Sequence, residues 1–156
     1  MTTLEGQKVV VTGGSRGLGL GIVEALVAQN AQVTVVARDP ERLAEVSKRL
    51  GVKVTRGDVT DEKLARDVLS DVRPSVLVLN AGATPPMGPL HELSWENFSR
   101  AWDVDVKAGF HWVQETLRLP LPRGSRVIVA SSGAALNGSP LSGSHAGTKR
   151  TLWLMA

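Results

Sequence analysis

The stretch VVVTGGSRGLGLGIVEAL, residues 9–26, decides which fold the sequence predicts. Its valine run is typical of a buried strand, and its apolar end is typical of a helix. Between them lie Gly13, Gly17 and Gly19. Because glycine has no side chain, backbone amides at the start of such a helix can approach a pyrophosphate closely. The stretch therefore predicts a dinucleotide-binding turn, and the alternative is a turn that is merely tight.

The rest of the chain alternates short β-branched runs with segments of helical length. We predict five buried strands, at 8–11, 32–36, 52–55, 76–79 and 126–130. This alternation implies right-handed βαβ crossovers and a doubly wound parallel sheet, an α/β fold of Rossmann-like type. We expect one domain over residues 1–156, with the sheet truncated after the fifth strand and the start of the following helix.

Helix boundaries are marked by capping residues. Asp39 precedes Pro40, which predicts a helix start, and Gly51 ends that helix. Thr60 is expected to cap the next helix. A longer helix is predicted from Ser94 to about residue 119, before two prolines.

Composition narrows the class of protein. The 156 residues are 42% hydrophobic and 21% charged, which is typical of a folded globular chain. The net charge of +3 is small and dispersed, so no nucleic-acid partner is expected. The chain has no cysteine, and its apolar run near the start is too short for a signal peptide or a membrane span. We expect a soluble cytoplasmic protein with no membrane partner and no metal site.

Five motifs occur in a familiar order: TGxxxGxG at 12–19, GDV at 57–59, LNAG at 79–82, VIVASS at 127–132, and a segment ending at Lys149. In this order the sequence resembles the short-chain dehydrogenase/reductase family, and the resemblance covers the whole chain. It implies an oxidoreductase that moves a hydride between a nicotinamide cofactor and a small-molecule carbonyl or alcohol.

The resemblance also implies a set of cofactor-binding residues. They are Gly13, Ser15, Arg16, Gly17, Leu18 and Gly19 around the phosphates and ribose, Asp58 and Val59 at the adenine, Asn80, Ala81 and Gly82 beside the adenosine ribose and the nicotinamide half, and Lys149 at the nicotinamide ribose. For Asn80 the alternative is that its side chain only bridges strands.

The choice of cofactor is argued from charge. An NAD site usually presents a carboxylate after the second strand, which accepts a hydrogen bond from the ribose 2′-hydroxyl. Here Arg38 follows that strand and Arg16 lies in the glycine loop. Two guanidinium groups suit a 2′-phosphate, so the sequence favours NADP(H). Asp39 is interpreted as a helix cap and not as a ribose ligand.

The positions that carry catalysis in the family hold Asp105, Ser132, His145 and Lys149 here. The family has Asn where this chain has Asp105 and Tyr where it has His145, and the chain contains no tyrosine. Lys149 lowers the pKa of a neighbouring imidazole, whereas a carboxylate at 105 raises it. Two interpretations stay open: His145 is a working acid/base, or the chain is a catalytically idle NADP-binding sensor or partner subunit. An inert fragment is a third possibility.

Two expectations concern assembly. The family domain is longer, so either this chain is a truncated version of a longer product or a partner covers the apolar edge of its last strand. Trp112 lies off the apolar stripe at 95–113, which suggests a second buried face on the long helix. We therefore expect a homodimer or homotetramer formed through this helix.

Overall fold

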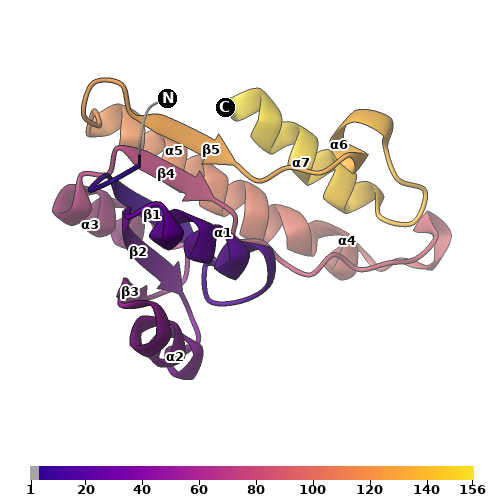
Figure 1. Ribbon diagram of the computed structural model, residues 1–156. Helices are drawn as coiled ribbons and strands as arrows, with labels where there is room; N and C mark the ends of the chain where they lie inside the picture. The colour runs from indigo at the N-terminus through magenta and orange to yellow at the C-terminus, as the bar shows by residue number, and fades with distance from the viewer. Residues whose placement is uncertain (1–3) are drawn as a thin grey trace.

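The computed structural model describes residues 4–156 and contains a five-stranded, all-parallel sheet in the order β3-β2-β1-β4-β5 (Figure 1). The strands are β1 (Lys8–Thr12), β2 (Gln32–Ala37), β3 (Lys53–Arg56), β4 (Val76–Leu79) and β5 (Arg126–Val129). The predicted doubly wound α/β fold is confirmed.

Helices cover both faces of this sheet (Figure 1). The α-helices are α1 (Gly17–Ala28), α2 (Pro40–Leu50), α3 (Glu62–Val72), α4 (Trp95–Ala101), α5 (Lys107–Arg118), α6 (Ala134–Asn137) and α7 (Gly143–Met155), with a 3₁₀ turn η1 (Leu90–Glu92) and a π-helical turn η2 (Trp102–Val106). Within residues 4–156, no helix is both long and apolar enough to cross a membrane.

Alternation along the central strands builds two cores. Val9 and Val11 of β1 face α1 and α2, whereas Val10 faces α3 and α5. The outer strands differ from the prediction of burial: β3 and β5 remain largely exposed because each lies at one edge of the sheet. In the described part of the chain no strand pairs with the outer side of β5, where Val127 and Ile128 are exposed.

The predicted caps of α2 are confirmed. The Asp39 side chain accepts hydrogen bonds at the start of the helix, and Gly51 ends it in a left-handed conformation, φ 67°. The prediction for α3 is wrong by one residue, because Asp61 caps this helix through Lys63 N. Thr60 instead donates its backbone N–H and its hydroxyl to Asp58.

The long predicted helix is interrupted by η2, and its buried face is not the face that the sequence predicted. Trp112 is fully buried against the chain's own sheet, and its Nε1 donates to Val59 O at 3.0 Å. Trp95, Trp102 and Phe110 of the predicted stripe are exposed. The buried positions recur every three or four residues through η2 and hold small and acidic residues beside Trp112, so a stripe chosen by its apolar residues missed them. These positions are Ala101, Asp105, Ala108, Trp112 and Glu115. Trp112 therefore gives no sign of a second buried face.

Candidate functional site

The strand order reverses between β1 and β4, and the carboxyl ends of these two strands frame a crevice. This is where open parallel sheets bind ligands. The loop after β1 runs close beside the end of β4. Gly13 has φ +69°, and a Cβ there would lie 2.8 Å from Ala81 Cα. Only glycine suits this position, because both the conformation and the space exclude a side chain.

A second close approach lies between the loop and α1. A Cβ at Gly19 would overlap the carbonyl oxygen of Gly13 and would lie 2.5 Å from Asn80 Nδ2. That amide donates to Thr12 O and Gly13 O, both at 3.3 Å. Asn80 thus ties the end of β4 to the glycine loop, as the bridging alternative proposed.

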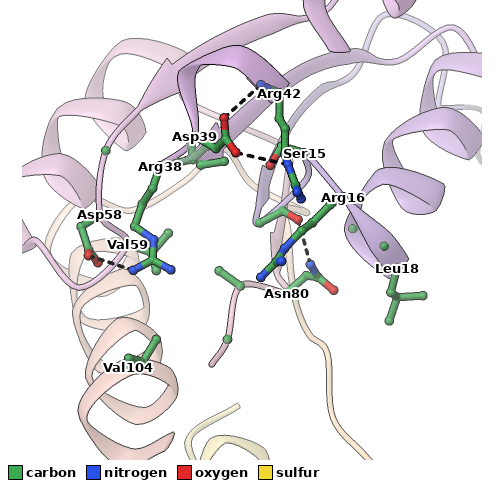
Figure 2. Close-up of a pocket in the computed structure, with 18 residues that line it drawn as sticks. Ser15, Arg16, Leu18, Arg38, Asp39, Arg42, Asp58, Val59, Asn80 and Val104 are labelled. Carbon is green, nitrogen blue, oxygen red and sulfur yellow. Dashed lines mark hydrogen bonds and ion pairs between the residues drawn. The ribbon is translucent and has the colours of Figure 1, made fainter. Parts of the chain in front are cut away.

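These segments enclose a cavity of about 430 Å³ (Figure 2). Its lining is Gly13, Ser15, Arg16, Gly17, Leu18, Gly19, Val36, Ala37, Arg38, Asp39, Arg42, Gly57, Asp58, Val59, Asn80, Ala81, Gly82 and Val104. Every residue that the sequence assigned to the cofactor is among them, except Lys149. The volume is in the range of ordinary ligand pockets.

The sequence did not assign five of the lining residues to the cofactor, and it assigned Asp39 only to the helix. The five are Val36, Ala37, Arg42, Gly57 and Val104. One signal was available for Arg42. It lies three residues after the helix cap, so it shares one end of α2 with Asp39.

Charged groups line the cavity on the side of β2 and α2 (Figure 2). Arg16 and Arg38 both line it, on opposite sides in this view (Figure 2). Arg38 Nη1 lies 3.7 Å from Asp58 Oδ2, and Arg42 Nε lies 3.2 Å from Asp39 Oδ2. The pKa of Asp58 is lowered, chiefly by the hydrogen bond from Thr60 N, so this carboxylate is charged at neutral pH.

A second group of polar residues adjoins the cavity at Gly82. Asp105, in η2, is buried, and its Oδ1 accepts from Ala83 N at 2.7 Å. Its Oδ2 lies 3.2 Å from Nζ of Lys149, which is also buried. A Cβ at Gly82 would lie 2.8 Å from the same Oδ2. This carboxylate therefore joins the loop after β4 to α7.

His145 lies on α7, one turn before Lys149, as predicted. It is half-buried, and its Nδ1 has no hydrogen-bond partner among residues 4–156. Its pKa is lowered, first by burial and then by the Lys149 charge, while Asp105 opposes both. The sequence left open whether Lys149 or Asp105 has the larger effect on this pKa. Because the pKa is lowered, the neutral imidazole is favoured, and it can accept a proton.

Ser132 follows β5 and is half-buried. Its Oγ accepts from Ala134 N at 3.2 Å, which leaves the hydroxyl hydrogen available to donate. Of the loop at 82–90, only Gly82 lines the cavity. Gly88 N instead donates to Leu141 O at 2.9 Å, so this loop is tied to the segment before α7.

Comparison with known proteins agrees with this geometry. The family model for short chain dehydrogenase matches residues 7–155. The chain belongs to the short-chain dehydrogenase family. Its five-stranded sheet, glycine loop and α7 lie within the matched residues, and the resemblance drawn from the five sequence motifs is confirmed.

Individual members of the family cover nearly the whole chain. The chain is 29% identical to 2,5-dichloro-2,5-cyclohexadiene-1,4-diol dehydrogenase of Sphingobium indicum and 34% identical to galactitol 2-dehydrogenase of Rhizobium johnstonii, with 97% and 90% of this chain aligned. It spans 64% and 55% of the lengths of those proteins. The solved structure of a blue fluorescent protein from a metagenomic library, in complex with NADPH, is 27% identical, with a TM-score of 0.84; the match covers 99% of this chain and 67% of that one.

Proposed function

We propose that residues 1–156 form one NADP(H)-binding domain of an oxidoreductase that interconverts a small-molecule alcohol and the corresponding carbonyl compound. One observation carries the proposal: the glycine-lined cavity adjoins the Asp105, His145 and Lys149 group through Gly82. A nucleotide site and a proton-transfer group therefore lie side by side at the carboxyl end of the sheet.

The cavity suits a nicotinamide nucleotide that carries a 2′-phosphate. Glycines line one part of the cavity, and the two of them at 13 and 19 allow the loop to pack against Ala81 and Asn80 without side chains between. Arg16 and Arg38 supply positive charge on the lining. The structure of a family member in complex with NADPH supports this assignment. Replacing Arg38 with Asp is expected to weaken NADPH binding much more than NADH binding, and an equal loss of both would contradict a role in selecting the phosphate.

Each polar residue has a separate task in the proposed reaction. Ser132 donates its hydroxyl hydrogen to the substrate oxygen, Lys149 holds the nicotinamide ribose, and Asp105 fixes Lys149. The bound nicotinamide supplies or accepts the hydride. In alcohol oxidation the hydroxyl proton passes to the neutral His145, and in carbonyl reduction protonated His145 returns it. Because the His145 pKa is lowered, we expect oxidation to be favoured at neutral pH and reduction at lower pH.

A catalytically idle NADP-binding subunit is the second candidate. The observation that favours it is the buried ion pair, since Asp105 already engages the ammonium that would hold the ribose. Titration with NADPH by fluorescence, followed by a panel of carbonyls and alcohols, separates the two functions. Binding with turnover supports the enzyme, binding alone supports the subunit, and neither indicates an inert fragment.

Variants at residue 145 test the proton-transfer role. His145→Ala is expected to abolish turnover and to leave the affinity for NADPH nearly intact. His145→Tyr restores the family's residue beside Lys149, so it should gain carbonyl reduction if the parent is idle only at this position. Unchanged turnover in His145→Ala would contradict the role of His145.

We also propose that the chain assembles as a homodimer or homotetramer through the α4–α5 segment, where Trp95, Trp102 and Phe110 are exposed. Sedimentation at micromolar concentration tests this, and a monomer would contradict it.

A further inference from the structure

The two carboxylate oxygens of Asp39 have different partners. Oδ1 accepts the backbone N–H groups of Glu41 and Arg42, both at 3.1 Å, and so caps α2. Oδ2 lies 3.2 Å from Nε of the Arg42 side chain. Asp39 and Arg42 both line the nucleotide cavity (Figure 2). One oxygen is therefore held by the backbone, and the other is held only by a guanidinium.

Asp39 lies where a carboxylate can affect the choice between NAD(H) and NADP(H). It follows β2 by two residues, where a carboxylate would accept a hydrogen bond from a ribose 2′-hydroxyl and repel a 2′-phosphate. With Arg42 on Oδ2, one hydrogen-bonding position of this oxygen is occupied and the negative charge of the carboxylate is partly offset. The same acidic residue then no longer favours the unphosphorylated ribose.

We propose that Arg42 is a specificity-determining residue, which selects NADP(H) over NAD(H) by occupying Oδ2 of Asp39. This inference rests on the proposed function of the cavity. It assigns to Arg42 an action through Asp39, unlike Arg16 and Arg38, which act on the phosphate itself.

The cap allows this action to be isolated. The donors to Oδ1 are backbone N–H groups, so they remain when the Arg42 side chain is removed. Arg42→Ala should therefore free Oδ2 without unfolding the start of α2. Because both side chains are about half-exposed, the pair is of modest strength, and we expect changes in affinity of about tenfold or less.

The experiment measures dissociation constants for NADPH and NADH by fluorescence. In Arg42→Ala, NADPH binding should weaken about tenfold and NADH binding should tighten several-fold, since the freed oxygen can accept the 2′-hydroxyl. The matched control is Arg49→Ala in the last turn of the same helix, where Arg49 Nη2 pairs with Glu24 Oε1 at 2.7 Å, away from the cavity. This control should leave the ratio of the two constants unchanged.

A second background tests whether Arg42 acts through Asp39. Asp39→Asn keeps an oxygen for the cap and removes the charge, so removing Arg42 from this variant should change the ratio less than about twofold. The inference is overturned if removing Arg42 changes the ratio of the two dissociation constants as much in the Asp39→Asn background as in the parent. It is also overturned if Arg42→Ala weakens the binding of both nucleotides equally. Either result leaves the proposed function standing. A parent protein that binds neither nucleotide overturns both.

Discussion

The glycine loop at 13–19 and the Asp105–Lys149 pair lie at the same end of the sheet, but the loop consists mainly of small residues and the pair of two charged side chains. The loop depends on the absence of side chains at Gly13 and Gly19, because a Cβ at either position would clash with neighbouring backbone atoms. In the pair, two buried charges hold each other in place. The first region should therefore be damaged by adding atoms, and the second by removing a charge.

The largest expected effect comes from breaking the buried pair. Lys149→Met leaves the Asp105 carboxylate buried without its cation, so the free energy of unfolding should fall by about 3–5 kcal/mol. The control is Arg150→Met on the same helix, where an exposed guanidinium stacks over Trp153 with Cζ 4.0 Å from the ring centroid. Its loss should cost about 1 kcal/mol or less. Urea denaturation measures both, and similar losses would show that burial of the pair has no energetic role.

The next largest effect is expected from adding a methyl group in the glycine loop, with a nearby glycine of the same helix as the control. Gly19→Ala adds a methyl group against Gly13 O and Asn80 Nδ2, so it should cost about 1–3 kcal/mol of stability and abolish NADPH binding. Gly21→Ala, on the same helix, adds its methyl where, apart from the adjoining residues and backbone of the helix itself, no atom of the described residues lies within 4 Å. That change should stabilise the protein by up to about 1 kcal/mol. NADPH binding that survives Gly19→Ala would mean that the loop is not the phosphate cradle.

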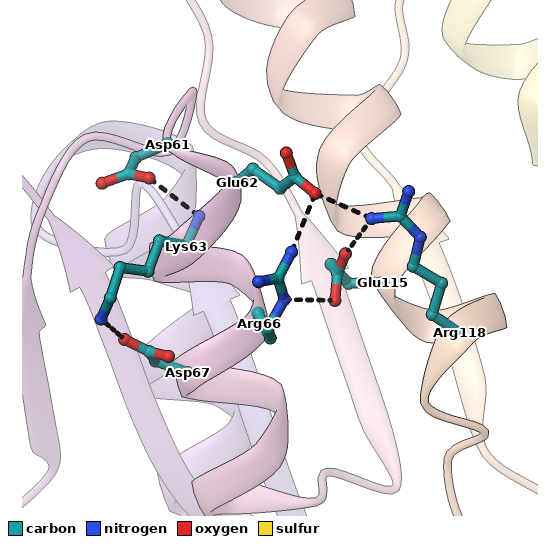
Figure 3. Close-up of polar contacts among 7 residues, drawn as sticks. All are labelled: Asp61, Glu62, Lys63, Arg66, Asp67, Glu115 and Arg118. Carbon is teal, nitrogen blue, oxygen red and sulfur yellow. Dashed lines mark hydrogen bonds and ion pairs between the residues drawn. The ribbon is translucent and has the colours of Figure 1, made fainter.

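A third test uses charges far from the cavity, where α3 meets α5 (Figure 3). Buried Glu115 pairs with Arg118 at 2.7 Å and with Arg66 at 3.4 Å. The Arg118 hydrogen bond is the main cause of its lowered pKa, although burial opposes the shift. A carboxylate with a lowered folded-state pKa stabilises the fold above its unfolded pKa, and this contribution is lost as pH falls through the folded value.

Glu115→Gln should therefore lower stability at neutral pH by about 1–3 kcal/mol and remove part of the loss of stability in acid. Asp67→Asn is the control, because the pair of Asp67 with Lys63 is exposed, so its loss should change the free energy of unfolding little. Unfolding measured from neutral to acidic pH checks both variants. Equal pH dependence of the parent and Glu115→Gln would contradict the assignment.

The smallest expected effect concerns the pH dependence of His145, beside the Asp105–Lys149 pair. Proton acceptance needs neutral His145, so alcohol oxidation should rise as pH rises through its lowered pKa, and carbonyl reduction should fall over the same range. Asp105 is the one cause that raises this pKa. Asp105→Asn should move both profiles to lower pH. A profile that stays in place would show that Asp105 has no electrostatic effect on His145.

Local features of this protein could be predicted from the sequence because their causes lie within a few residues. The Asp39 cap and the Gly51 stop depend on one turn of chain, and the central strands on runs of valine. The π-helical turn was not predictable from a 3.6-residue pattern. The buried face of the α4–α5 segment was missed because it holds Asp105 and Glu115 beside Trp112, whereas the prediction followed the apolar residues. Arg42 was missed because the cavity that it lines forms only when the start of α2 lies beside the loop after β1.

By itself the sequence determined the parallel sheet, the position of the glycine loop and the presence of His145 where the family has tyrosine. These follow from periodicity, from backbone freedom and from residue identity, which need no knowledge of distant contacts. Only the tertiary structure decided that Asp105 pairs with Lys149 and that the His145 pKa falls. Those outcomes depend on how deeply η2 and α7 bury their charges against each other, and the free energy of a charge depends on its surroundings in space.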